Sequence, residues 1–198
     1  MLPKKLLLEQ GATIKSYKKG EFIFNKGNTA KHYYQIISGE IKMNNFNDDG
    51  KEFTQGVFKK GESFGEPPLF TNRVYPANAE VLKNVEILIL PKENFIKLMN
   101  IPNIGMEMLT IFSKRLYYKS LIAVEISSET PEHRVLSLFD YLKKYNFKKE
   151  TSNENFKIDF TRQEIANLTG LRVETVIRSI KNLENKEKII IINRKVYL

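Results

Sequence analysis

The sequence predicts an α+β protein: an all-β sandwich or barrel comes first, a long helix follows, and short helices with a β-hairpin end the chain. Three observations support this order. Seven of the ten glycines fall between Gly20 and Gly65, where they separate short β-prone runs. After Pro102, apolar residues recur at spacings of three and four, and Gly170 joins two short helical segments. We expect three parts, namely 1–100, 101–129 and 130–198.

The N-terminal part is expected to hold antiparallel strands separated by turns. The Asn47-Asp-Asp-Gly50 segment predicts a hairpin connection, because Asp and Gly tolerate the backbone angles of tight turns. Pro91 suits the start of a short helix over 92–99. The expected strands are 21–24, 33–37, 41–46, 51–58, 77–82 and 85–90.

A long amphipathic helix is expected from Asn103 to Ser128. One apolar row contains Met108, Leu109, Phe112, Leu116, Ala123 and Ile126, and a second contains Ile104, Met108, Ile111, Tyr118 and Ile122. Two rows suggest two partners, the protein's own barrel and a second copy of the helix, although packing inside one monomer is the alternative. The residues expected at the dimer interface are Met108, Phe112, Arg115, Lys119, Ile122 and Ile126.

The C-terminal part reads as helices with a β wing. A helix over 132–145 overlaps the beginning of a polar loop at 143–155, and a short strand follows at 156–160. Two more helices are expected at 161–168 and 172–184. A hairpin closes the chain, with strands 189–192 and 196–198 around the turn 193–195.

The two helices joined through Gly170 predict a helix-turn-helix. Thr161 and Glu164 form a capping-box pattern at the start of the first helix. In the second helix, the side expected to face the core comprises Val173, Val176, Ile177, Ile180 and Leu183. The opposite side comprises Glu174, Thr175, Arg178, Lys181 and Asn182, with Arg172 at its edge. Arginine can pair with guanine, and glutamate can accept from the amino group of cytosine.

Composition narrows the function classes. The net charge is +9, and residues 130–198 carry 14 Lys and Arg against 9 Asp and Glu, which fits a nucleic-acid partner or a solvated basic surface. The absence of cysteine excludes cysteine-ligated iron–sulfur clusters. Two histidines are too few for a multi-histidine metal site within one chain, so we expect no metal. With neither a membrane-length apolar run nor a signal-peptide pattern, we expect a cytoplasmic protein.

The run from Thr161 to Arg178 resembles the helix-turn-helix of the cyclic-AMP receptor/fumarate-nitrate regulator (CRP/FNR) family of bacterial transcription factors. The resemblance implies a transcription regulator that binds palindromic double-stranded DNA as a homodimer, with RNA polymerase as a further partner. An arginine is common in the family at the position of Val173. The residues expected to contact DNA are Thr161, Arg162, Gln163, Arg172, Val173, Glu174, Thr175, Arg178 and Lys181.

The N-terminal half resembles the same family's cyclic-nucleotide-binding-like jelly roll, through the segments 20–27, 34–42 and 61–66. The resemblance places an effector pocket at Phe64, Gly65, Glu66, Arg73, Ala77, Lys119 and Ser120. Glu66 matches the glutamate that holds ribose in cyclic-AMP binders. Pro76-Ala77, however, stands where such binders carry an arginine for the cyclic phosphate, and Lys119 stands where they carry an adenine-contacting residue.

These differences predict that cyclic AMP is not the effector, and the effector's identity stays open. A haem sensor would need an axial ligand such as His32, which we expect to be an exposed structural histidine. Two other function classes are compatible with parts of the sequence: a cyclic-nucleotide-regulated protein that acts without DNA, and a scaffold that dimerises through the long helix. The sequence has no P-loop and no Ser/His/Asp set, so an enzyme is not expected.

Overall fold

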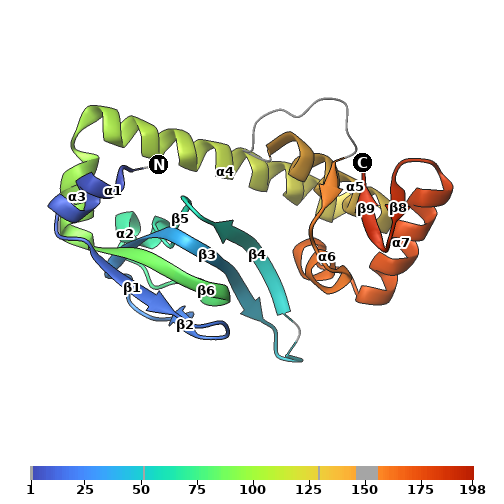
Figure 1. The fold of residues 1–198 in the computed structure, drawn as a ribbon, viewed down its shortest axis with the longest axis horizontal. Helices are drawn as coiled ribbons and strands as arrows, with labels where there is room; N and C mark the ends of the chain where they lie inside the picture. Colours follow the sequence, from blue (N-terminus) through green and yellow to red (C-terminus); the bar gives the residue numbers. More distant parts are fainter. Residues whose placement is uncertain (1, 51, 129, 146–155) are drawn as a thin grey trace. The chain divides into compact units, whose positions relative to one another are not determined.

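The computed structural model describes residues 2–50, 52–128, 130–145 and 156–198. The chain forms two compact units, Met1–Lys114 and Arg115–Leu198, and the long helix α4 (Pro102–Ser128) passes from the first into the second (Figure 1). As predicted, the first unit is built around an antiparallel sheet and the second consists of helices with a small sheet.

The first unit is an antiparallel jelly roll. Its strands are β1 (Thr13–Tyr17), β2 (Phe22–Phe24), β3 (His32–Phe46), β4 (Glu52–Lys59), β5 (Ser63–Phe64) and β6 (Asn78–Pro91). The central order is β1-β6-β3-β4, with β2 paired to β6 and β5 paired to β3. The predicted hairpin joins β3 to β4, and Gly50 has the positive φ of 73° that such a connection needs.

The prediction that Gly39 ends a strand is wrong. The predicted strands 33–37 and 41–46 are one strand, β3, and 77–82 with 85–90 are likewise one strand, β6. The register between β3 and β6 shifts around Ser38, which marks a bulge. A Cβ added to Gly39, whose φ is +87°, would lie 2.2 Å from the carbonyl oxygen of Asn84. The glycine therefore permits close strand contact and does not make a turn.

Four helices belong wholly or partly to the first unit: α1 (Lys4–Glu9), α2 (Pro67–Thr71), α3 (Lys92–Met99) and the beginning of α4. Helix α3 was predicted with these bounds. Helices α1 and α2 and strand β1 were not anticipated, because they are short and lack strong periodicity. Tertiary packing stabilises α1, whose Leu7 is completely buried.

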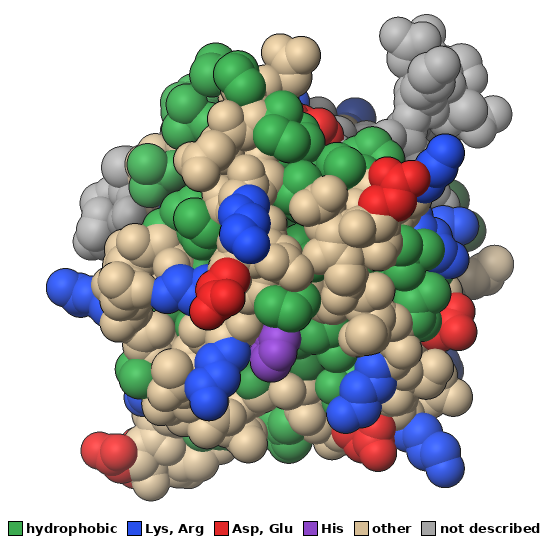
Figure 2. Space-filling model, turned by 90° about the vertical axis from the view of Figure 1, so that its left-hand side faces the viewer, with side chains coloured by type: hydrophobic (Ala, Val, Ile, Leu, Met, Phe, Trp, Pro, Cys, Tyr) green, Lys and Arg blue, Asp and Glu red, His purple; other side chains and the backbone are tan. Residues whose placement is uncertain are grey.

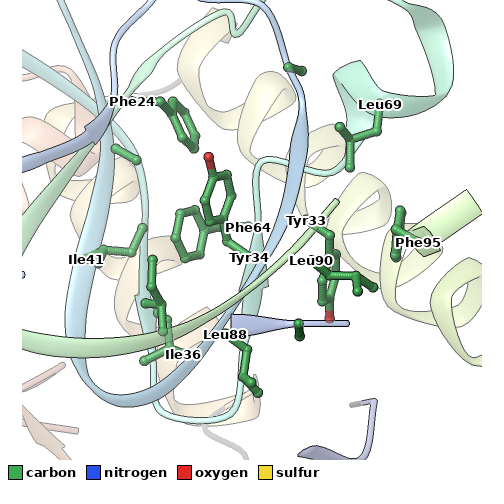
Figure 3. Close-up of a cluster of buried hydrophobic side chains, with 14 of the residues drawn as sticks. Phe24, Tyr33, Tyr34, Ile36, Ile41, Phe64, Leu69, Leu88, Leu90 and Phe95 are labelled. Carbon is green, nitrogen blue, oxygen red and sulfur yellow. The ribbon is translucent and has the colours of Figure 1, made fainter. Parts of the chain in front are cut away.

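The core of the first unit is rich in aromatic rings. Tyr33 stacks on Phe95 of α3 with ring centroids 4.5 Å apart, and both side chains are completely buried (Figure 3).

Charged side chains on the face drawn in Figure 2 are scattered between hydrophobic and polar ones and do not form one patch.

The second unit contains α5 (Pro131–Tyr145), α6 (Arg162–Thr169), α7 (Val173–Asn185) and a sheet of order β7-β9-β8. Its strands are β7 (Lys157–Ile158), β8 (Ile190–Ile192) and β9 (Lys195–Tyr197). Helix α5 continues into the predicted loop as far as Tyr145; the rest of that loop, 146–155, lies outside the described residues. The buried core side chains include Val135, Phe139, Ile165, Ile180 and Val196.

The C-terminal hairpin has a two-residue turn, not the predicted three-residue one. Asn193 and Arg194 have φ angles of 49° and 63°, and Lys195 already belongs to β9. Two consecutive residues with positive φ define a type I′ turn, whose twist matches that of the flanking strands. This hairpin forms the wing.

Candidate nucleic-acid interface and effector site

The capping box at the start of α6 is present as predicted. The Thr161 hydroxyl accepts a hydrogen bond from the Glu164 backbone N–H at 3.1 Å, and the Glu164 carboxylate accepts from the Thr161 N–H at 2.6 Å. Gly170 ends the helix in the left-handed conformation, with φ of 70°. Arg172 is the extended residue before α7. The predicted helix-turn-helix therefore forms.

Helix α7 packs on α5 and α6 and leaves one side in solvent. Its buried side chains are Val176, Ser179, Ile180 and Leu183. Four residues predicted to contact DNA are exposed on or beside this helix: Arg172, Glu174, Arg178 and Lys181. Val173 and Thr175, also predicted to contact DNA, are half-buried, and Val173 packs against the core.

The prediction that Ile177 faces the core is wrong. Its side chain is 52% exposed, while Ser179, which was not assigned to the core, is 1% exposed. Ile177 lies at the edge of the apolar side, and the packed surface is centred on Val176, Ile180 and Leu183. Helical periodicity alone does not show where the edge of a core lies.

Asn182 holds α7 to the beginning of α5. The sequence suggested that it faces outward with the residues predicted to contact DNA, but it does not. Its amide donates a hydrogen bond to Glu132 Oε1 at 2.7 Å, in a partly buried position. This hydrogen bond holds the pKa of the Glu132 carboxyl below its usual value, so Glu132 is ionised at neutral pH. The contact fixes the position of α7 within its own unit.

The beginning of α6 presents the three remaining residues predicted to contact DNA. Thr161 and Gln163 are exposed, and the Gln163 amide donates to Asn167 Oδ1 at 2.9 Å. Arg162 is half-buried, and burial lowers the pKa of its guanidinium, which remains protonated at neutral pH. A helix N-terminus with a cationic side chain is a suitable contact for phosphate.

In the first unit, the predicted effector region contains a packed aromatic cluster: Phe24, Tyr34, Phe64 and Tyr75. Phe24 stacks on Tyr75 at 3.6 Å, and Tyr34 stacks on Phe64 at 5.2 Å between ring centroids. Figure 3 shows Phe24, Tyr34 and Phe64 directed toward one another. The Tyr34 and Tyr75 hydroxyls are hydrogen-bonded to each other. Burial raises the pKa of both phenols, so both are neutral at physiological pH.

Three of the predicted effector residues are buried beside this cluster. Phe64 belongs to it, Ala77 is completely buried, and Glu66 is 1% exposed at the start of α2. Gly65 has φ of +76°, and a Cβ there would lie 3.1 Å from the Phe24 ring. Arg73 is exposed in the segment after α2.

The other two predicted effector residues, Lys119 and Ser120, belong to the second unit. Both are exposed on α4, and the Ser120 hydroxyl donates to the Tyr117 carbonyl at 2.7 Å.

His32 begins β3 and is half-buried, whereas the sequence predicted an exposed histidine. Burial and the neighbouring Lys31 lower its pKa. A hollow of about 390 Å³ is lined by other residues, among them Ser16, Tyr17, Ser38 and Asn84.

Helix α4 has a buried and an exposed apolar side. Met108 is 1% exposed within the core of the first unit, and Phe112 packs on that core with its ring 5.8 Å from Phe70. Of the other residues predicted at the dimer interface, Arg115 is half-buried, Lys119 is exposed, and the side chains of Ile122 and Ile126 lie outside the described part. Among the side chains of α4 that the structure describes, four large apolar ones are exposed: Met106, Leu109, Leu116 and Tyr117.

Comparison with known proteins agrees with both halves of the architecture. Residues 14–101 match the family described as the cyclic nucleotide-binding domain, and residues 133–198 match the Crp-like helix-turn-helix domain. The transcriptional activator protein Anr of Pseudomonas protegens is 25% identical over 182 residues, which is 91% of this chain and 74% of that protein.

Two further comparisons support the same result. The fumarate nitrate reduction regulatory protein of Klebsiella oxytoca is 27% identical over 83% of this chain, and the match spans 66% of that protein, just under two thirds. The structure of the c-di-GMP responsive global regulator CLP of Xanthomonas campestris has the same fold, with a TM-score of 0.78 at 22% identity over 98% of this chain and 99% of that one.

A nucleotide-binding-type jelly roll followed by a helix-turn-helix defines a class of DNA-binding transcription regulators. The chain belongs to the CRP/FNR family of this class. None of the helices in the described part of the chain combines the length and apolarity needed to cross a membrane.

Proposed function

We propose that this chain regulates transcription as a homodimer that binds palindromic promoter sites, and that its sensor domain does not respond to cyclic AMP. The observation that carries the proposal is the exposed side of α7, where Glu174, Arg178 and Lys181 lie together on a well-packed helix. The parts 1–100, 101–129 and 130–198 serve as sensor, dimerisation helix and DNA-binding domain.

In this proposal α7 enters the major groove. Arg172, Glu174 and Arg178 face the bases, because guanidinium groups match the acceptors of guanine and a carboxylate matches the amino group of cytosine. Val173 lies at the edge of this contact. Thr175 and Lys181 approach phosphates, as do Thr161, Arg162 and Gln163 at the start of α6. The hydrogen bond from Asn182 to Glu132 supports this placement by holding α7 on α5.

The exposed apolar side of α4 supports the homodimer. At about 100° per residue, Met106, Leu109, Leu116 and Tyr117 fall within about 100° of one another on one side of the helix. A second copy of the same helix supplies a matching apolar side. We therefore place the interface on these four residues. By the same angle per residue, the other residues that the sequence suggested fall about 60–120° beyond the edge of this side, toward Met108 and Phe112: Arg115, Lys119, Ile122 and Ile126.

The proposal makes the protein a binding protein that acts on DNA in the cytoplasm, not an enzyme. The pairing of a sensor domain with a helix-turn-helix supports this, since such proteins act by changing their own affinity for DNA. RNA polymerase is the partner through which a bound regulator would act.

Selection from random DNA tests the proposed function. We expect a palindromic consensus whose half-sites are centred about 34 Å, one helical turn, apart, because a two-fold symmetric dimer places its two α7 helices on one face of the duplex. Affinity for the consensus should fall with rising salt. If the protein selects no consensus, or selects a single unpaired half-site, the proposed function is wrong.

The packed aromatic cluster supports the exclusion of cyclic AMP. A cyclic phosphate needs a cation or backbone N–H donors, but Pro76 supplies neither, and Ala77 is completely buried. Arg73, the nearest candidate cation in the sequence, points into solvent as an exposed residue. A nucleotide would also have to displace stacked rings, because a Cβ at Gly65 would already crowd Phe24. The buried residues therefore do not fit this ligand.

Titration calorimetry with cyclic AMP and cyclic GMP is expected to show no saturable binding in the micromolar range. Promoter affinity should be the same with and without either nucleotide, because no differential binding means no population shift. Arg73→Ala is the matched control and should leave this result unchanged. A stoichiometric isotherm that Arg73→Ala abolishes would reverse the argument and make Arg73 the phosphate-binding cation.

A further inference from the structure

The feature that the proposed function leaves unexplained is Ile177. This large apolar side chain is 52% exposed on α7 and is not among the residues that pack against the core of the second unit. Its neighbours one turn away along the helix are the exposed Glu174 and Lys181. Ile177 is thus an exposed apolar side chain at the edge of the apolar side of α7, next to exposed charged residues.

Helix geometry places Ile177 on the side that faces DNA in the proposed complex. At about 100° per residue, Ile177 lies about 60° from Glu174 and about 40° from Lys181 around the helix axis. It lies about 4.5 Å along the axis from Glu174, at a rise of about 1.5 Å per residue. A base pair next to the one that Glu174 contacts is therefore within its reach.

We infer that Ile177 reads a thymine by contact with its C5-methyl group. The thymine methyl is the only apolar group that base pairs present in the major groove, and apolar side chains recognise it by direct contact. The surface around Ile177 is charged, so a single methyl group matches it better than the broad apolar surface of a protein partner. This inference rests on the proposed function and assigns one base pair of each half-site.

Deoxyuridine substitution tests the contact, because deoxyuridine keeps the pairing of thymine and lacks only the methyl group. Each thymine of the selected palindrome is replaced in turn, first in one half-site and then in both, and the dissociation constant is measured. At one thymine of each half-site, we expect the single substitution to weaken binding about fourfold, the equivalent of about 0.8 kcal/mol for one methyl-sized group. The doubly substituted duplex should bind roughly ten- to twentyfold more weakly.

Two variants make the test specific. In Ile177→Ala the deoxyuridine penalty should disappear at that one position, because the single alanine methyl is too short to reach the thymine methyl that the longer isoleucine side chain contacts. Lys181→Ala is the matched control: it should weaken binding to both duplexes and keep the penalty. The exposed position of Ile177 means that the alanine variant should unfold at the wild-type temperature, which circular dichroism checks.

The two proposals fail in different ways. If the wild type selects a palindrome but no thymine shows a penalty, or if Ile177→Ala keeps the penalty, the assignment of Ile177 is wrong and the proposed function stands. If the wild type selects no palindrome, the proposed function is wrong, and the assignment of Ile177 is wrong with it.

Discussion

Leu116→Glu is expected to convert the dimer into monomers at micromolar concentrations. Leu116 is 69% exposed in the protomer, on the same side of α4 as Met106, Leu109 and Tyr117. In the proposed dimer the substitution buries one unpaired carboxylate per protomer, at a cost of several kcal/mol each. Sedimentation velocity should show the monomer mass, and affinity for the palindromic site should fall because only one α7 helix then binds.

Lys114→Glu provides the matched control for this substitution. Lys114 is exposed on the same helix, about 60° beyond the edge of the apolar side, so a carboxylate introduced there should leave the dimer intact. Both variants should fold, because neither residue belongs to a buried core in the protomer. A dimer that survives Leu116→Glu unchanged would mean that this side of α4 is not the interface.

Glu174→Ala is expected to remove base discrimination at one base pair of each half-site without abolishing DNA binding. Loss of a carboxylate that accepts from a cytosine amino group costs about 1–3 kcal/mol per half-site and relaxes the preference at one base pair. Glu174 is exposed at the beginning of α7, so its loss should not unfold the helix. A repeated selection from random DNA should return the wild-type consensus with one degenerate position in each half-site.

Lys181→Ala separates charge attraction from base reading. Lys181 is exposed on the same side of α7, and in the proposal it faces phosphate. Its loss should weaken all sequences alike and lower the slope of log affinity against log salt by about one per contact, or two per dimer. If Glu174→Ala leaves the consensus unchanged while Lys181→Ala alters it, α7 is not placed in the groove as proposed.

Elements with strong local signals could be predicted closely. The capping box of Thr161 and Glu164, the glycine after α6 and the bounds of α3 depend on residues within one or two turns of each other, and the structure confirms them. The absence of interior proline and the steady apolar spacing likewise predicted α4. The match of whole motifs to a family predicted the order of the domains.

Elements that depend on distant segments could not be predicted. Gly39 suggested a turn, yet it permits the close approach of Asn84, a residue far along the chain. The short helices α1 and α2 have no strong signal of their own, and α1 is stabilised by burial of Leu7. No local pattern distinguishes a glycine that turns the chain from one that admits a neighbouring strand.

The sequence by itself thus determined the order of the elements, the presence of the helix-turn-helix and the residue types that it offers to DNA. Tertiary structure decided which side of each amphipathic helix is buried. Phe112 is covered by Phe70 and the core of its unit, whereas Leu116 is exposed; Ser179 is buried, whereas Ile177 is exposed. Helical spacing shows which residues share a side, but burial depends on the width and position of the surface that packs against it, and that surface comes from segments elsewhere in the chain.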